Sequence, residues 1–220
     1  MTTRTTRRPT ILAPILLIAC SAAAQDNKPP THTLTQDNQS RRVEVWAKPG
    51  LTQSPVSFAI DWKGNVYVAE TDRAGNAVSD TRVLGKLNAV EEDLKLKSVE
   101  DRRALINKWI AAGAFEKDFF TRTEDRVRIV RDTDGDGVAD SSAVFAGGFN
   151  DALDGIGAGV LFLNNSIYYT CIPSLWKLTD TNNDFAADTR EKLSSGYGVR
   201  WCFFGHDLHG LALGPDGRVY

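Results

Sequence analysis

The fold of this chain is indicated by one acidic stretch, Asp132-Thr133-Asp134-Gly135-Asp136-Gly137-Val138-Ala139-Asp140. A weaker copy begins 48 residues later, at Asp180-Thr181-Asn182-Asn183-Asp184-Phe185-Ala186-Ala187-Asp188. Segments typical of short strands stand before and after both copies, and each unit ends in glycine and aromatic residues. A strand unit that recurs about every 40 to 50 residues without a long helix is typical of the blades of a β-propeller.

A second repeated phrase supports the same interpretation. It consists of a buried strand, a polar turn and a second strand that begins with an aliphatic residue and a tyrosine. Its three copies are residues 58–67, 160–168 and 211–220. The sequence therefore predicts an all-β protein, a partial β-propeller with about two blades and the start of a third. Because a propeller ring normally has about four to eight blades, we expect the chain to be the front of a longer protein.

The first predicted blade contains an insertion with helical character, at residues 80–120. Asn88 precedes Glu91 by three positions, and Ser98 precedes Asp101 by three, so both pairs resemble N-terminal capping boxes. The apolar residues that follow fall on one helical face. Trp109 on this face is expected to pack on the rim of the propeller; stacking on a ligand is the alternative.

The N-terminus has the three regions of a secretory signal: arginines, an apolar run and small residues through Ala24. The apolar run is shorter than the roughly 18 residues of a membrane span. We therefore expect residues 1–24 to be a signal peptide and the protein to be exported to the periplasm or the cell surface. Cleavage after Ala24 is one alternative, and a lipobox with a lipidated Cys20 is the other. Residues 25–42 are expected to be a flexible tether, and residues 43–220 the incomplete propeller.

Charge and cysteine content narrow the expected partners. The formal net charge is −2, and it becomes −5 after removal of residues 1–24, which contain three arginines and no acidic residue. A nucleic-acid partner is not expected, since a polyanion requires a basic surface. Cys171 and Cys202 are the two cysteines outside the signal. In an oxidising compartment they form either a disulfide or two buried thiols.

The first acidic loop is a candidate calcium site. Four carboxylates occupy ligand positions one, three, five and nine of a calcium loop, and a valine carbonyl lies between them. The candidate ligands are Asp132, Asp134, Asp136, Val138 and Asp140. Ala143 stands where the bidentate glutamate of such a loop belongs. The alternative is a solvated, glycine-rich turn, and a bound cation would serve a structural role.

Two of the three histidines lie in Gly205-His206-Asp207-Leu208-His209-Gly210. Histidine accepts a proton near neutral pH, and an adjacent carboxylate can orient it. The alternatives are a general base, a metal site that lacks a third ligand, and a polar turn between blades. The glycine-rich residues 148–159 are expected to form an irregular loop between blades, in which Asp151 and Asp154 are candidate ligand contacts.

Several of these motifs together resemble one known family. They are Phe149-Asn150-Asp151-Ala152-Leu153-Asp154-Gly155-Ile156-Gly157-Ala158-Gly159, Cys171-Ile172-Pro173-Ser174-Leu175-Trp176, the acidic loops and the histidine motif. Over most of residues 40–220 the chain resembles the N-terminal propeller of bacterial proteins described as membrane-bound dehydrogenases. Longer members often carry helical repeats and a c-type cytochrome domain, so the resemblance implies a cytochrome domain as a partner in a longer parent chain. The haem motif Cys-x-x-Cys-His does not occur in this sequence.

The wider resemblance is to soluble quinoprotein glucose and sorbosone dehydrogenases. In that family a histidine eight residues before a Gly-Pro-Asp turn removes a hydroxyl proton while hydride passes to pyrroloquinoline quinone. The turn here is Gly214-Pro215-Asp216, and His206 stands eight residues before it. The resemblance implies an oxidoreductase acting on a sugar or alcohol, with His206 as general base and His209 as a second candidate. It places the quinone-binding residues in later blades. The alternative function is a non-catalytic propeller that binds carbohydrate or another protein and is stabilised by calcium loops.

Overall fold

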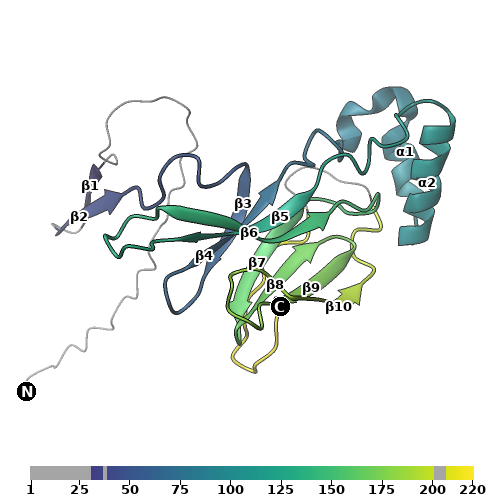
Figure 1. Ribbon diagram of the computed structural model, residues 1–220. Helices are drawn as coiled ribbons and strands as arrows, with labels where there is room; N and C mark the ends of the chain where they lie inside the picture. The colour runs from purple at the N-terminus through teal and green to yellow at the C-terminus, as the bar shows by residue number, and fades with distance from the viewer. Residues whose placement is uncertain (1–30, 37–38, 201–206) are drawn as a thin grey trace, which may run out of the picture.

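The computed structural model describes residues 31–36, 39–200 and 207–220, and these residues are mostly β (Figure 1). Two four-stranded antiparallel sheets dominate, and in each the strands lie in chain order. The first sheet contains β3 (Pro55–Ile60), β4 (Val66–Thr71), β5 (Asp125–Arg131) and β6 (Ser141–Phe149). The second contains β7 (Gly157–Leu163), β8 (Ser166–Cys171), β9 (Ser174–Thr179) and β10 (Thr189–Ser195). The prediction of a mostly β chain built from repeated antiparallel units is confirmed, and the described residues form no closed ring.

The main core lies between the two sheets and follows from the alternation of side chains along each strand. On β5, Val127 and Ile129 point to one face and are fully buried. On β8, Ile167, Tyr169 and Cys171 do the same from the second sheet. Successive residues of a strand point to opposite faces, so this spacing directs one face of each sheet into the shared core.

The other face of the first sheet is covered by the segment that precedes β3. Val66, Val68 and Val130 are buried there with Ala139, which follows the first acidic loop. The backbone N–H of Ala139 donates to the carbonyl of Trp46 at 2.7 Å. Strand β4 is therefore buried on both faces, as expected for its nearly continuous apolar sequence.

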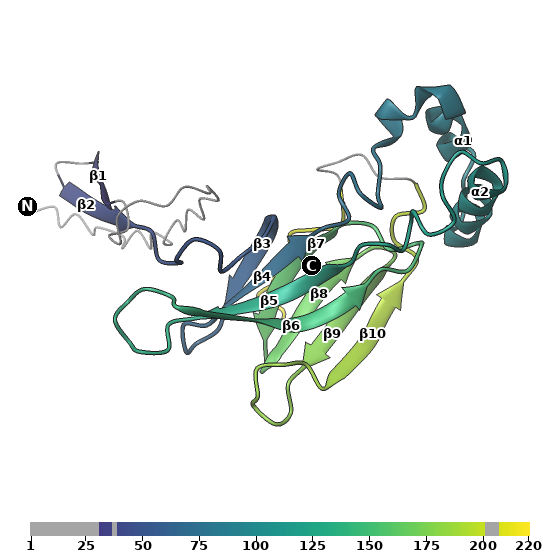
Figure 2. The ribbon, with the colours of Figure 1, turned by 45° about the horizontal axis from the view of Figure 1, so that its top comes forward.

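The strand order determines where each connection lies. In an antiparallel meander, alternate connections emerge at the same end of the sheet. The β4–β5 connection, the β6–β7 loop and the chain after β10 share one end, and both acidic loops emerge at the other. Helices α1 (Ala89–Leu94) and α2 (Val99–Ala111), with the 3-10 turns η1 (Thr81–Val83) and η2 (Gly85–Leu87), lie between β4 and β5 (Figures 1 and 2). We call this the helix end of the sheets, and the opposite end the loop end.

Of the two predicted capping boxes, one is confirmed. The Ser98 side chain accepts a hydrogen bond from the Asp101 backbone N–H at 3.0 Å, and Asp101 accepts one from the Ser98 N–H at 3.0 Å. The box predicted at Asn88 is wrong, because its side chain makes no capping hydrogen bond. Asn88 also ends η2, and this role gives it a left-handed φ of 48°.

Helix α2 packs on the β6–β7 loop. Leu105 and Trp109 are buried against Phe120, and the same cluster includes Leu153 and Ile156 from the loop. Trp109 is thus a packing residue, in agreement with its expected amphipathic position.

The glycine-rich residues 148–159 are more regular than the sequence predicts, because β6 ends at Phe149 and β7 begins at Gly157. A Cβ at Gly157 would lie 1.6 Å from the Tyr169 hydroxyl oxygen, and one at Gly159 would lie 2.5 Å from Thr170 Oγ1. Two of the glycines therefore permit a close approach between strands rather than an irregular loop.

Both ends of the described chain contain short paired segments. Part of the range predicted to be a tether forms an antiparallel hairpin of β1 (Thr31–Gln36) and β2 (Gln39–Glu44). The predicted start of a third blade forms only an isolated bridge between Leu213 and Val219. The predicted signal peptide and Cys20 lie outside the described residues. Among the described helices, none combines the length and apolar character needed to cross a membrane.

Gly157→Ala is expected to lower the free energy of unfolding by about 2 to 3 kcal/mol, because an added methyl group overlaps the Tyr169 ring. Gly85→Ala is the matched control, since an added Cβ at Gly85 has no neighbour within 4 Å. Denaturant titration of the full-length protein measures both variants. Equal stabilities would contradict the close contact at Gly157.

Candidate functional site

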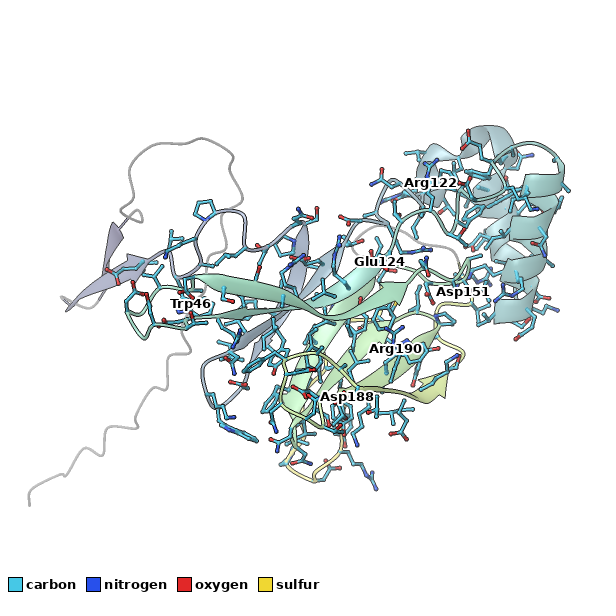
Figure 3. All side chains as sticks on the ribbon, viewed as in Figure 1. Trp46, Arg122, Glu124, Asp151, Asp188 and Arg190 are labelled. Atoms are coloured by element: carbon cyan, nitrogen blue, oxygen red, sulfur yellow. The ribbon has the colours of Figure 1, made fainter. Side chains whose placement is uncertain are left out.

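Buried polar side chains gather at the helix end of the two sheets. They are Arg73, Asp125, Asp154, Tyr169 and Cys171. Four of them are fully buried, and the Asp154 side chain is mostly so. Figure 3 shows this region between the sheets and the helices, where Glu124 and Asp151 are labelled. Charged groups are rarely buried without compensating partners, and the buried charged groups of this cluster have such partners.

The Arg73 side chain binds main-chain carbonyls of the β6–β7 loop. Its guanidinium donates to the carbonyl oxygens of Thr123 at 3.0 Å, Asp151 at 3.2 Å and Asp154 at 2.8 Å. The contacts join the start of the helical insertion, its end and the loop between the sheets. A planar group with several donors is suited to link three carbonyls that lie far apart in sequence.

Asp125 joins the two sheets. One of its oxygens accepts from the N–H groups of Asp72 at 3.0 Å and Arg73 at 3.1 Å, and the other from Gly157 at 2.8 Å. Burial raises the pKa of this carboxyl to about 6, although the hydrogen bonds act in the opposite direction.

The two loop aspartates predicted as ligand contacts have different surroundings. Asp154 accepts from the Asp151 N–H at 2.8 Å, and burial raises its pKa to about 6. Asp151 is exposed, and it accepts from the Leu153 N–H at 2.9 Å and from Arg103 at 3.1 Å. Asp154 is therefore the one that can exchange a proton near neutral pH.

The histidine motif is described only from Asp207 onward, and His206 lies outside the described residues. Thr170 Oγ1 on β8 donates to the Leu208 carbonyl oxygen at 2.5 Å. A Cβ at Gly155 would lie 3.2 Å from Asp207 Oδ1, which places that carboxylate beside the residue that follows Asp154. His209 is exposed. The structure therefore brings the 207–209 segment to the helix end, next to the buried acids.

Cys171 is a buried free thiol. Its Sγ lies 3.9 Å from the carbonyl oxygen of Gly155, and burial raises the pKa of the thiol well above its ordinary value. Burial therefore favours the protonated thiol over the thiolate, which is the reactive form. Its predicted pairing partner, Cys202, lies outside the described residues.

The neighbouring phenol is Tyr169. Burial raises its pKa well above the ordinary value, and its hydroxyl has no hydrogen-bond partner among the described residues. The ring packs edge-on against Phe149 with centroids 4.7 Å apart. Tyr169 therefore contributes as a neutral ring to the core.

The first acidic loop lies at the loop end. One carboxylate oxygen each from Asp132, Asp134 and Asp136 lie within 4.8 Å of one another. Asp132 also accepts from the N–H groups of Gly135 at 2.7 Å and Gly137 at 2.9 Å, and such backbone hydrogen bonds lower its pKa. The three predicted ligands at positions one, three and five are thus brought together, as a hard cation requires.

The two other predicted ligands of this loop are held differently. Asp140 accepts from the backbone N–H of Thr133 at 3.0 Å and from its hydroxyl at 2.9 Å. The Val138 N–H donates to Asp136 at 2.8 Å. The Thr133–Asp140 hydrogen bonds therefore join the two ends of the loop.

The second acidic loop has the same hydrogen-bond pattern. Asp180 accepts from the N–H groups of Asn183 at 2.7 Å and Phe185 at 2.8 Å, and Asp188 accepts from Thr181 at 2.6 Å. Asn183 and Phe185 replace the glycines of the first loop and keep positive φ angles of 63° and 70°. Within the described residues, this loop contains no group of three acidic ligands.

The second loop also contacts the first sheet. The Phe185 ring lies under the Arg131 guanidinium, 3.8 Å from ring centroid to Cζ, and the Ala187 N–H donates to the Phe145 carbonyl at 2.8 Å. Figure 3 labels Asp188 in this loop, away from the helices. The acidic loops and the buried polar cluster therefore lie at opposite ends of the sheets.

The sequence does not identify Arg73, Asp125 and Thr170 as part of the site. Each stands within or directly beside a strand and matches no motif. Their roles follow from contacts between residues that are 32 to 81 positions apart. A local pattern carries no signal for such contacts.

Asp154→Asn is expected to gain stability relative to the unchanged chain as pH rises from about 4 to about 6. The raised pKa means that the folded state binds more protons than the unfolded state in this interval. The free energy of unfolding of the wild-type protein therefore falls as pH rises. The difference should grow by at most about 1.4 kcal/mol per pH unit. Urea denaturation between pH 4 and 7 measures it, with exposed Asp118→Asn as control. A pH-independent difference would contradict the burial of Asp154.

Comparison with proteins of curated function and with solved structures finds no match. One family model does match, and it covers residues 34–220. The match spans both sheets, the helical insertion and the 207–209 segment. The chain therefore belongs to the family described as a domain of unknown function, DUF7133.

Proposed function

We propose that this chain is part of an exported β-propeller oxidoreductase, related to quinoprotein sugar dehydrogenases, which oxidises a sugar or alcohol hydroxyl with His206 as general base. The observation that carries the proposal is the position of the 207–209 segment. It directly follows His206 in sequence and lies against Thr170, Gly155 and Gly159 at the helix end. The two repeated sheets support it, since they pack face to face with β3 and β7 side by side, as neighbouring blades do.

The chemistry requires removal of a hydroxyl proton as hydride leaves the same carbon. An imidazole has the appropriate pKa for this step. An adjacent carboxylate would favour the protonated imidazole that forms, and Asp207 directly follows His206 in the sequence. His209 is a second candidate for this role.

The described residues do not fit a quinone site. The buried guanidinium groups of Arg73 and Arg102 donate to main-chain carbonyls. They are not directed at a ligand carboxylate. Pyrroloquinoline quinone, the hydride acceptor that the family resemblance implies, would be held by other residues. The proposal includes a cytochrome domain of a longer parent chain as the electron acceptor.

The test uses the full-length protein with calcium, pyrroloquinoline quinone, a panel of sugars and alcohols, and an artificial electron acceptor. His206→Ala is expected to lower kcat by about 100-fold or more, the usual effect of removing a general base. His209→Ala tests the second candidate, and its expected loss is below about tenfold when His206 is the base. Absence of acceptor reduction by the wild-type protein, or full activity of His206→Ala, would overturn the assignment.

A second candidate function is a non-catalytic propeller that binds carbohydrate or another protein. It is favoured by the apolar side chains that β3 and its turn expose. Trp62 is 68% exposed, and Val56, Phe58 and Ile60 lie outward at alternate positions of the strand. An exposed tryptophan can stack on a sugar ring. Saturable sugar binding that is lost in Trp62→Ala, without any oxidation, would favour this function.

We also propose that calcium binds the first acidic loop and has a structural role. Three carboxylates within 4.8 Å of one another repel, and a cation would relieve that repulsion. The loop end is remote from the 207–209 segment, so the cation would not contact a substrate there.

Export, through a cleaved signal peptide or a lipidated Cys20, is proposed on the sequence alone.

Calcium is expected to raise the Tm of the full-length protein by a few degrees, because it binds only the folded loop. Asp134→Asn should abolish the rise, since it removes one ligand charge. Asp184→Asn, at the position of the second loop that corresponds to Asp136, is the control and should retain it. Differential scanning calorimetry with and without EDTA measures the effect. An equal rise in Asp134→Asn would contradict binding at the first loop.

A further inference from the structure

Thr170 makes a hydroxyl hydrogen bond that packing of the core does not require. Its side chain is fully buried on β8, and Oγ1 donates to the Leu208 carbonyl at 2.5 Å, across 38 residues of sequence. Packing alone would accept a valine of the same shape. The hydroxyl is required only because a carbonyl of the 207–209 segment lies against it.

Two glycines leave room for this segment. Gly159 is paired with Thr170 across β7 and β8. A Cβ at Gly159 would lie 2.5 Å from Thr170 Oγ1 and 3.3 Å from the His209 Cα. A Cβ at Gly155 would lie 3.2 Å from Asp207 Oδ1. The segment therefore lies directly on the backbone of the second sheet, and its position is fixed at Asp207, Leu208 and His209.

We propose that Thr170 is a positioning residue for the proposed reaction: its hydroxyl fixes the peptide of Leu208, two residues after the proposed base in the sequence, and so anchors the 207–209 segment to β8. The inference rests on the proposed function for its catalytic consequence. The attachment of the segment to β8 is independent of that function, because it follows from the hydrogen bond and the glycines alone.

The test compares Thr170→Val, which keeps the shape and removes the donor, with Thr170→Ser, which keeps the donor. Thr179→Val is the matched control, because Thr179 shares a 2.9 Å hydroxyl hydrogen bond with Ser166 in the same sheet and does not touch the segment. The full-length protein is used throughout. The first readout is the rate of chymotrypsin cleavage after Leu208. The second is kcat and KM for acceptor reduction as a function of pH.

Thr170→Val is expected to be cleaved after Leu208 about fivefold faster than wild type, the effect of losing one buried hydrogen bond. Thr170→Ser and Thr179→Val should stay within about twofold of wild type. In the reaction, Thr170→Val should lower kcat about tenfold and shift the acidic limb of the pH profile, which reports deprotonation of the base, with KM nearly unchanged. Thr170→Ser should restore both.

Each outcome separates the two proposals. Unchanged cleavage of Thr170→Val, or equally faster cleavage of Thr179→Val, overturns the attachment. Faster cleavage of Thr170→Val with normal kcat and pH profile overturns the positioning role. Faster cleavage of Thr170→Val alone, in a protein that reduces no acceptor, supports the attachment and counts against the proposed function.

Discussion

The carboxylate of Asp125 is the interaction on which the arrangement of the two sheets depends. It binds two N–H groups at the end of β4 and one at the start of β7, so a single buried side chain connects the sheets. A buried charge is costly unless its hydrogen-bonding capacity is filled, and here three backbone donors fill it. Arg73 completes the connection by holding the intervening loop through its carbonyls. The apolar core sets how far apart the sheets lie, and these polar contacts set how they are aligned.

The meander topology places the buried acids and the acidic loops at opposite ends of the sheets. The connections at the helix end carry the buried acids, the Thr170 contact and the helices that cover the β6–β7 loop. The connections at the loop end carry the two acidic loops. A cation in the first loop would therefore act on the stability of a turn, and chemistry near the 207–209 segment would depend on the opposite end. The same antiparallel order therefore keeps the acidic loops apart from the buried acids.

The parts of the fold that the sequence predicts are those with local, periodic signals. The repeated strands, the acidic loops and the capping box at Ser98 all depend on residues close in sequence. Asn88 was not predictable in the same way, because its conformation is set by the preceding 3-10 turn. The sequence predicts Gly157 in an irregular loop, whereas the position lies on β7 and requires glycine because the Tyr169 ring on the adjacent strand leaves no room for a Cβ. The sequence does not predict the contacts of Arg73 for the same reason, because their partners are distant in sequence.

The second acidic loop shows what happens to such a turn when its defining residues change. Phe185 occupies a left-handed conformation in which a bulky side chain is rare, and its ring lies against Arg131 of the neighbouring sheet. The carboxylate of Asp180 still gathers the same N–H groups as its counterpart Asp132. The shape of the turn is thus maintained by backbone contacts rather than by composition. A turn of this kind can therefore act as a mechanical joint between neighbouring sheets without the glycines and the third carboxylate that the first loop contains.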